Sequence, residues 1–158
     1  YYGYFLDHID EIKEVKVITK TAVEIAKDTL VSTADYLSRA IPEVEKLANE
    51  FYKTPKQESW NRLAQLLEGI EWIVTTFSTI DEGYDIQKIV KSYEVWNLYA
   101  KDVYSLKDLM YEFEEVLNSQ DYISIADILA YEISPLFKQM LNKLSLLVGE
   151  EGDYNVIN

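Results

Sequence analysis

Four carboxylates near the middle of the chain have the residue type and spacing that could bind a divalent cation. Glu68 and Glu71 are three residues apart, which places two side chains on one face of a helix. Glu82 and Asp85 repeat this spacing a short distance later. Because carboxylate oxygens are the protein ligands that Mg²⁺ prefers, and because the bound ion can then hold substrate phosphates, the pattern raises the hypothesis of magnesium-dependent chemistry.

This arrangement resembles the magnesium-binding pattern of the all-helical nucleotide pyrophosphohydrolases. The resemblance implies carboxylates from adjacent helices that hold the metal against the phosphates of a nucleotide. The chain departs from the pattern because its second pair lies at a turn around Gly83, close to the first pair, and no cluster of Lys or Arg accompanies them. A nucleotide hydrolase is therefore the alternative hypothesis, and it predicts that Glu68, Glu71, Glu82 and Asp85 converge within about 5 Å of one point.

Other catalytic and cofactor chemistry has little support in the sequence. His8 is the single histidine and cysteine is absent, so neither a thiolate zinc site nor a di-iron site built from paired Glu-x-x-His motifs can be assembled. No glycine-rich phosphate loop and no Gly-x-Ser-x-Gly motif occurs. The sequence favours a protein that is not an enzyme and has no cofactor.

The segment 102–132 carries acidic and aromatic residues that suit a binding surface. It holds eight Asp or Glu residues against Lys107 alone. Such a run is typical of a solvated outer face, and it also fits a docking surface for a basic partner, where charge steers association. Aromatic residues are favoured at protein interfaces. The predicted partner-binding residues are Tyr104, Asp108, Tyr111, Glu112, Glu115 and Tyr131.

The overall charge narrows the class of partner. The chain has 28 acidic residues against 15 basic ones, a formal net charge of -13. This surface repels nucleic-acid phosphates and anionic lipid, so we expect neither nucleic acid nor membrane as a partner. The remaining class of partner is a protein, either a basic protein or a second copy of this chain. The cysteine-free composition and the lack of a signal-peptide pattern favour the cytoplasm. The missing initial Met leaves open whether the chain is an excerpt of a longer protein.

The elements that would position these residues are predicted to be helices. Only five glycines and three prolines occur in 158 residues, which favours long uninterrupted elements. A first helix begins near Thr19, and Pro42 predicts a kink or break near 38–42. Its core side is predicted to carry Val23, Ala26, Leu30, Thr33, Leu37, Ala40, Val44, Leu47 and Phe51.

The second helix completes a hairpin over about 19–80. Thr54 is its predicted cap, with Pro55 at the first helical position, and Gly83 ends it. Its predicted core residues are Trp60, Leu63, Leu67, Ile70, Val74 and Phe77.

A second hairpin is predicted over about 85–148. Asp85 caps a third helix that runs to 118, with a possible break near 92–96, and Asp121 caps a fourth helix that Pro135 should bend. The predicted core residues are Trp96, Tyr99, Val103, Leu106, Met110, Phe113 and Leu117, followed by Leu129, Ile133, Leu136, Met140, Leu144 and Leu147.

The two hairpins resemble each other at an offset of 62 residues. Phe51 then aligns with Phe113 and Trp60 with Tyr122, without a gap at the turn. We therefore predict one all-α domain over 1–158, an up-down four-helix bundle formed by two similar αα-hairpins with pseudo-twofold symmetry. A short N-terminal helix or arm over 1–18 and a frayed tail over 149–158 complete it.

Two stretches indicate a family. Trp60–Trp72 and Asp121–Leu136 together resemble an uncharacterised family of small all-helical proteins from Gram-positive, spore-forming bacteria, over about 36–141. The resemblance implies no activity that can be transferred. The hairpin layout is also similar to the acidic helical chaperones of flagellar and type III export, which implies an adaptor or chaperone-like role by analogy of fold alone.

Overall fold

The computed structural model describes residues 21–148, and every regular element in this range is helical. The predicted all-α class is confirmed. The arm expected over 1–18 and the tail expected over 149–158 lie outside the described residues. The elements are α3 (Ala22–Tyr52), α4 (Gln57–Gly83), α5 (Ile86–Ile89), α6 (Tyr93–Ser119), α7 (Tyr122–Ile128), the π-helical turn η1 (Leu129–Ile133) and α8 (Ser134–Val148).

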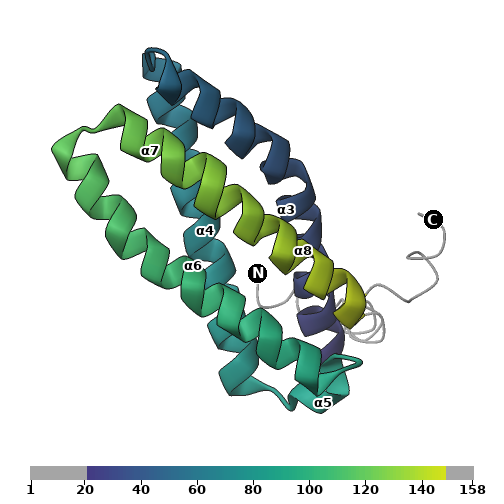
Figure 1. Ribbon diagram of the computed structural model, residues 1–158. Helices are drawn as coiled ribbons and strands as arrows, with labels where there is room; N and C mark the ends of the chain where they lie inside the picture. The colour runs from purple at the N-terminus through teal and green to yellow at the C-terminus, as the bar shows by residue number, and fades with distance from the viewer. Residues whose placement is uncertain (1–20, 149–158) are drawn as a thin grey trace, which may run out of the picture.

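The long helices lie side by side and alternate in direction along the chain (Figure 1). α7, η1 and α8 follow one another as a single segment, which packs against α3 and α6. α4 also packs against α3 and α6, but α4 and α6 pack least closely of the adjacent long helices. None of the described helices combines the length and apolar character needed to cross a membrane.

α3 follows its predicted pattern closely. Thr21 and Glu24 form a capping box, in which the Glu24 N–H donates to Thr21 Oγ1 (3.1 Å) and the Thr21 N–H donates to Glu24 Oε1 (2.9 Å). All predicted core residues except the half-buried Val23 are buried. The break predicted near Pro42 is wrong, because α3 continues past it. Ser38 and Pro42 are both exposed, so water can bind the carbonyl group that the proline leaves without a donor.

The start of α4 corrects the sequence prediction. The helix begins at Gln57, and Thr54 and Pro55 precede it. The residue at the cap position is Lys56, not Thr54, and the Lys56 N–H donates to Ser59 Oγ (3.1 Å) in the first turn. The predicted end of the helix at Gly83 is confirmed.

The predicted third helix is two helices. Asp85 caps α5 as predicted, accepting a hydrogen bond from the Gln87 N–H (3.2 Å). The chain then leaves the helix at Val90, upstream of the expected break, and restarts where Ser92 Oγ accepts from the Val95 N–H (3.1 Å). Ser92 offers the start of α6 a side-chain cap that a continuous helix would have left unused.

Pro135 has a more local effect than the predicted bend. Asp121 caps α7 as predicted, accepting from the Ser124 N–H (3.1 Å). The chain then widens into η1, where the Ser134 N–H bonds to the Leu129 carbonyl five residues earlier. Proline lacks an N–H and its ring crowds the carbonyl group four residues before it, so the wide turn directly ahead of Pro135 provides the space that the ring needs.

Six further residues predicted to lie in the core are only half-buried. They are Trp60, Leu67, Val74, Met110, Leu117 and Leu136, whereas Leu66, Ile73, Leu109 and Phe137 are buried. On α8 only Leu136 differs from the prediction, because Phe137 takes the core position four residues after Ile133, whereas Met140, Leu144 and Leu147 are buried as predicted. On α4 and α6 the loose contact between the two helices leaves the apolar residues on this side only partly covered.

Polar contacts join the helices around this core. Asp102 is among the few buried charged or polar residues, and its Oδ2 accepts from Lys143 Nζ at 2.6 Å. Each contact links two different helical segments, so each fixes their relative position. The others are Tyr52 with Asp127, Trp96 Nε1 with Asp81 Oδ1 (2.9 Å), and Glu45 Oε2 with both Ser134 Oγ (2.9 Å) and Lys138 Nζ (2.9 Å).

Candidate functional site

The four carboxylates of the hydrolase hypothesis do not form a metal site. Glu68 and Glu82 lie on the same helix fourteen residues apart, which corresponds to about 21 Å along its axis. Asp85 is engaged in capping α5. Within residues 21–148 no group of three or more Asp, Glu, His or Cys side chains could hold a metal ion. The prediction that these carboxylates converge on one point is therefore wrong.

The six predicted partner-binding residues are divided between two sides of α6. Asp108, Glu112 and Tyr131 line a groove between α6 and the η1–α8 segment. Tyr111 lines a second groove, between α6 and α4, and Tyr104 packs edge-on against Phe77 of α4. Glu115 is exposed and lines neither groove. Sequence spacing placed five of these residues on one helix and Tyr131 on the next, but it could not show which neighbour each would face.

The groove between α6 and η1–α8, which we call the acidic groove, has a volume of about 480 Å³. Three carboxylates line it, from Asp108, Glu112 and Glu132, and its lining contains no Lys or Arg. A cationic group would therefore meet negative charge from both walls. The full lining is Ser105, Asp108, Leu109, Glu112, Tyr131, Glu132, Pro135, Leu136 and Gln139.

Glu132 is the groove carboxylate that sequence reasoning did not select, and its pKa is raised. Partial burial raises its pKa, and the negative charge of Glu112 across the groove raises it further. The wide turn η1 carries both Tyr131 and Glu132. Because a π-helical turn changes the direction of the following side chains, no regular helical pattern could have predicted this pair of facing carboxylates.

Replacing Glu112 with glutamine should lower the pKa of Glu132 toward its ordinary value. The substitution removes the neighbouring negative charge and leaves the burial in place, so only part of the shift should disappear. A pH titration of the side-chain carboxyl ¹³C resonances measures this directly. The matched variant Glu115→Gln, on the same helix but outside the groove, should leave the Glu132 titration unchanged. An unaltered midpoint in Glu112→Gln would show that the two carboxylates do not interact.

The second groove, which we call the apolar groove, lies between α4 and α6 and has a volume of about 560 Å³. Its floor includes four of the half-buried residues described above. Tyr104 and Tyr111 are more than half exposed beside it. The lining is Leu67, Ile70, Glu71, Val74, Thr75, Lys107, Met110, Tyr111, Phe113, Glu114 and Leu117.

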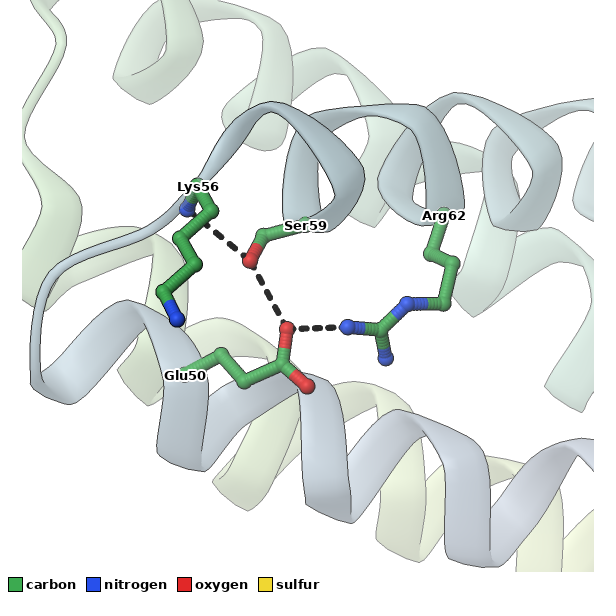
Figure 2. Close-up of polar contacts among 4 residues, drawn as sticks. All are labelled: Glu50, Lys56, Ser59 and Arg62. Atoms are coloured by element: carbon green, nitrogen blue, oxygen red, sulfur yellow. Dashed lines mark hydrogen bonds and ion pairs between the residues drawn. The ribbon is translucent and has the colours of Figure 1, made fainter.

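A third feature lies between α3 and α4, where the sequence analysis indicated nothing. Figure 2 shows that one carboxylate oxygen of Glu50 bonds to both Ser59 Oγ, at 2.8 Å, and the guanidinium group of Arg62. The hydrogen bond from Arg62 holds the pKa of Glu50 below its usual range. The sequence did carry a signal for this pair, because two opposite charges lie on either side of the predicted turn at Thr54 and Pro55.

Both arginines of the sequence, Arg39 and Arg62, line one pocket of about 310 Å³ between α3 and α4. Their charges are already compensated, because Arg39 pairs with Asp35 at 3.1 Å and Arg62 pairs with Glu50. Glu43 adds a further carboxylate to the lining. The pocket thus has a nearly balanced charge, whereas the acidic groove has three negative charges without a basic residue.

Comparison with known proteins identifies a family but no activity. Residues 28–143, well over half of the chain, match the family described as Domain of unknown function (DUF8042). The chain belongs to this family. The expected membership in an uncharacterised family is confirmed by this match. The expected origin of the family in Gram-positive, spore-forming bacteria stays a prediction. No curated protein and no solved structure matches the chain.

Proposed function

We propose that this DUF8042 chain is a protein-interaction module that binds a basic segment of a partner protein in the acidic groove. The observation that carries the proposal is the set of three carboxylates, from α6 and from η1, lining a groove without a Lys or Arg. A cation placed between Glu112 and Glu132 would relieve the repulsion that raises the pKa of Glu132.

The surroundings of the groove suit a protein segment. Tyr131 is 73% exposed at the groove, where an aromatic ring can stack on an arginine or cover the alkyl part of a lysine. Leu109 and Leu136 give the floor an apolar part. A segment that alternates basic and apolar side chains would match both features, and its association should be steered by charge.

The role that follows is that of an adaptor or chaperone-like module, without catalysis of its own. A net charge of -13 disfavours nucleic acid and anionic membrane as partners. We keep the cytoplasm as the proposed compartment, since a chain without cysteine needs no oxidising environment.

We propose further that the scaffold is an up-down four-helix bundle that arose by duplication of one αα-hairpin. In support, the rings of Trp60 and Tyr122, which are equivalent at the 62-residue offset, contact each other with their centroids 5.7 Å apart. Equivalent residues meet in this way where they lie beside a pseudo-twofold axis. The loss of the Glu50–Arg62 pair at the corresponding positions Glu112 and Ser124 is consistent with a second hairpin adapted to binding.

Affinity capture from a lysate of the source organism tests the binding proposal. The double variant Glu112→Gln/Glu132→Gln removes two charges from the groove, and Glu68→Gln/Glu82→Gln removes two charges from exposed positions on α4. We expect a partner retained at low salt by the wild type and by the α4 variant, and lost with the groove variant. Retention should fall as the salt concentration rises.

A direct titration then identifies the chemistry of the captured segment. Peptides covering the partner are added to the isotopically labelled chain, and the resonances of Tyr131 and Glu132 are followed. The expected ligand is a basic peptide, with an affinity at least tenfold weaker for the groove variant. Equal capture by all three proteins, or perturbation confined to residues away from the groove, would contradict the proposal.

A further inference from the structure

The apolar groove exposes residues that the sequence pattern assigned to a core. Leu67 and Val74 on α4, and Met110 and Leu117 on α6, recur at the spacing of a buried helical stripe. They are nevertheless only half-buried and line an open groove. Apolar residues in such a register are usually covered, so this face has the composition of an interface.

Exposed aromatic side chains flank the same face. Tyr104 and Tyr111 on α6 are 53% and 63% exposed. Tyr104 and Tyr111 are one heptad apart and therefore lie on one side of α6. Large aromatic residues around an apolar centre are enriched in protein–protein interfaces. The groove and its aromatic border thus form one continuous surface over α4 and α6.

The charged residues of this face are arranged so that they can pair with the same residues of a second copy. Lys107 and Glu114 lie at equal distances on either side of the midpoint between Met110 and Tyr111. If α6 crosses a second α6 in the antiparallel direction about this midpoint, Lys107 of each copy meets Glu114 of the other. The same register places Tyr104 opposite Leu117 and Met110 opposite Tyr111.

We propose that the apolar groove is the interface of a homodimer, formed by antiparallel packing of α6 on α6 of a second copy about a twofold axis near Tyr111. In an isologous interface each contact occurs twice, so the Lys107–Glu114 pair forms on both sides of the axis. Tyr111 of each copy enters the groove between α4 and α6 of the other, covering Met110 and Leu117.

The size of the face suits a weak dimer. Its residues cover 67–75 on α4 and 104–117 on α6, which corresponds to about 12 Å and 20 Å of helix length. Two adjacent helices, each about 10 Å across, then present roughly 400 Å² per copy, which is at the lower end of the range for specific interfaces. The acidic groove lies on the other side of α6, so the dimer leaves it open and does not depend on the function proposed for it.

Sedimentation equilibrium of the full chain tests the dimer with charge reversals. The single variants Lys107→Glu and Glu114→Lys each place like charges opposite one another twice, and the double variant restores both pairs with exchanged signs. We expect a wild-type dimer, a dissociation constant raised about tenfold or more in each single variant, and recovery in the double variant. The groove variant Glu112→Gln/Glu132→Gln is the matched control and should dimerise like the wild type.

Three results would overturn the proposal. A wild-type monomer at about 1 mM would assign the groove to another protein, since even a small specific interface is populated at that concentration. A dimer that tolerates both single reversals would use a different surface. Single variants that dissociate without recovery in the double variant would exclude the antiparallel register. Circular dichroism melting curves check that every variant remains folded, which is expected because both residues are exposed.

Discussion

Replacing Phe137 with alanine should lower the free energy of unfolding by about 3–5 kcal/mol. The ring is fully buried, at 0% exposure, among the core residues of α8. Truncation removes the apolar contacts of a whole ring, and the helices around it can close the cavity only in part. Urea denaturation followed by circular dichroism measures the change in the free energy of unfolding. An unaltered slope of this free energy against urea concentration shows that the variant and the wild type unfold in the same way.

The neighbouring substitution Leu136→Ala is the matched control, because the regular helical pattern had assigned Leu136 and not Phe137 to the core. Leu136 is half-buried and lines the acidic groove, so its truncation should cost about 1 kcal/mol. The order of the two effects therefore reports which of the two side chains lies in the core. A larger loss in Leu136→Ala than in Phe137→Ala would contradict the burial of Phe137.

The sequence was sufficient where helices follow regular geometry and local capping. On α3 the three-four spacing selected residues such as Leu30, Leu37 and Phe51 that are buried as predicted. Asp85 and Asp121 cap α5 and α7 as predicted, because an acidic side chain after a turn needs only its own backbone to form that contact. These features depend on residues within a few positions of each other.

The sequence was insufficient where neighbouring helices decide the outcome. Leu67 and Met110 have the spacing of core residues, but their exposure depends on how closely α4 approaches α6, which neither helix encodes alone. The turn η1 depends on a balance between the Pro135 ring and the packing of α3, and a strict periodicity cannot contain it.

The candidate site shows the same division. Asp108, Glu112 and Tyr131 were selected from charge and aromatic content, and they do line one groove. Tyr104 and Tyr111, selected on the same grounds, face α4 instead. Glu132 was counted among the acidic residues of the segment but was not selected, because its position near Glu112 depends on how the two arms of the second hairpin pack together.

Replacing Lys143 with methionine should destabilise the chain by about 2–4 kcal/mol at neutral pH. Asp102 is only 7% exposed, and Lys143 Nζ lies 2.6 Å from its Oδ2. Methionine keeps most of the volume and apolar contact of lysine but leaves the Asp102 carboxylate without its cation. The surroundings disfavour an isolated charge, since burial, with a contribution from Asp102, raises the pKa of the adjacent Tyr99.

The double variant Asp102→Asn/Lys143→Met distinguishes two contributions to the free energy of unfolding. One is the cost of leaving the buried Asp102 carboxylate unpaired, and the other is the net stabilisation by the ion pair. Asparagine has the shape of aspartate without its charge, so the double variant should regain at least half of the stability lost in Lys143→Met. Urea denaturation of all four proteins in a double-mutant cycle gives the coupling energy between Asp102 and Lys143. If the losses of the two single variants simply add, the pair does not act as a unit. Because the contact joins α6 to α8, a large coupling would mean that it fixes the walls of the acidic groove relative to each other.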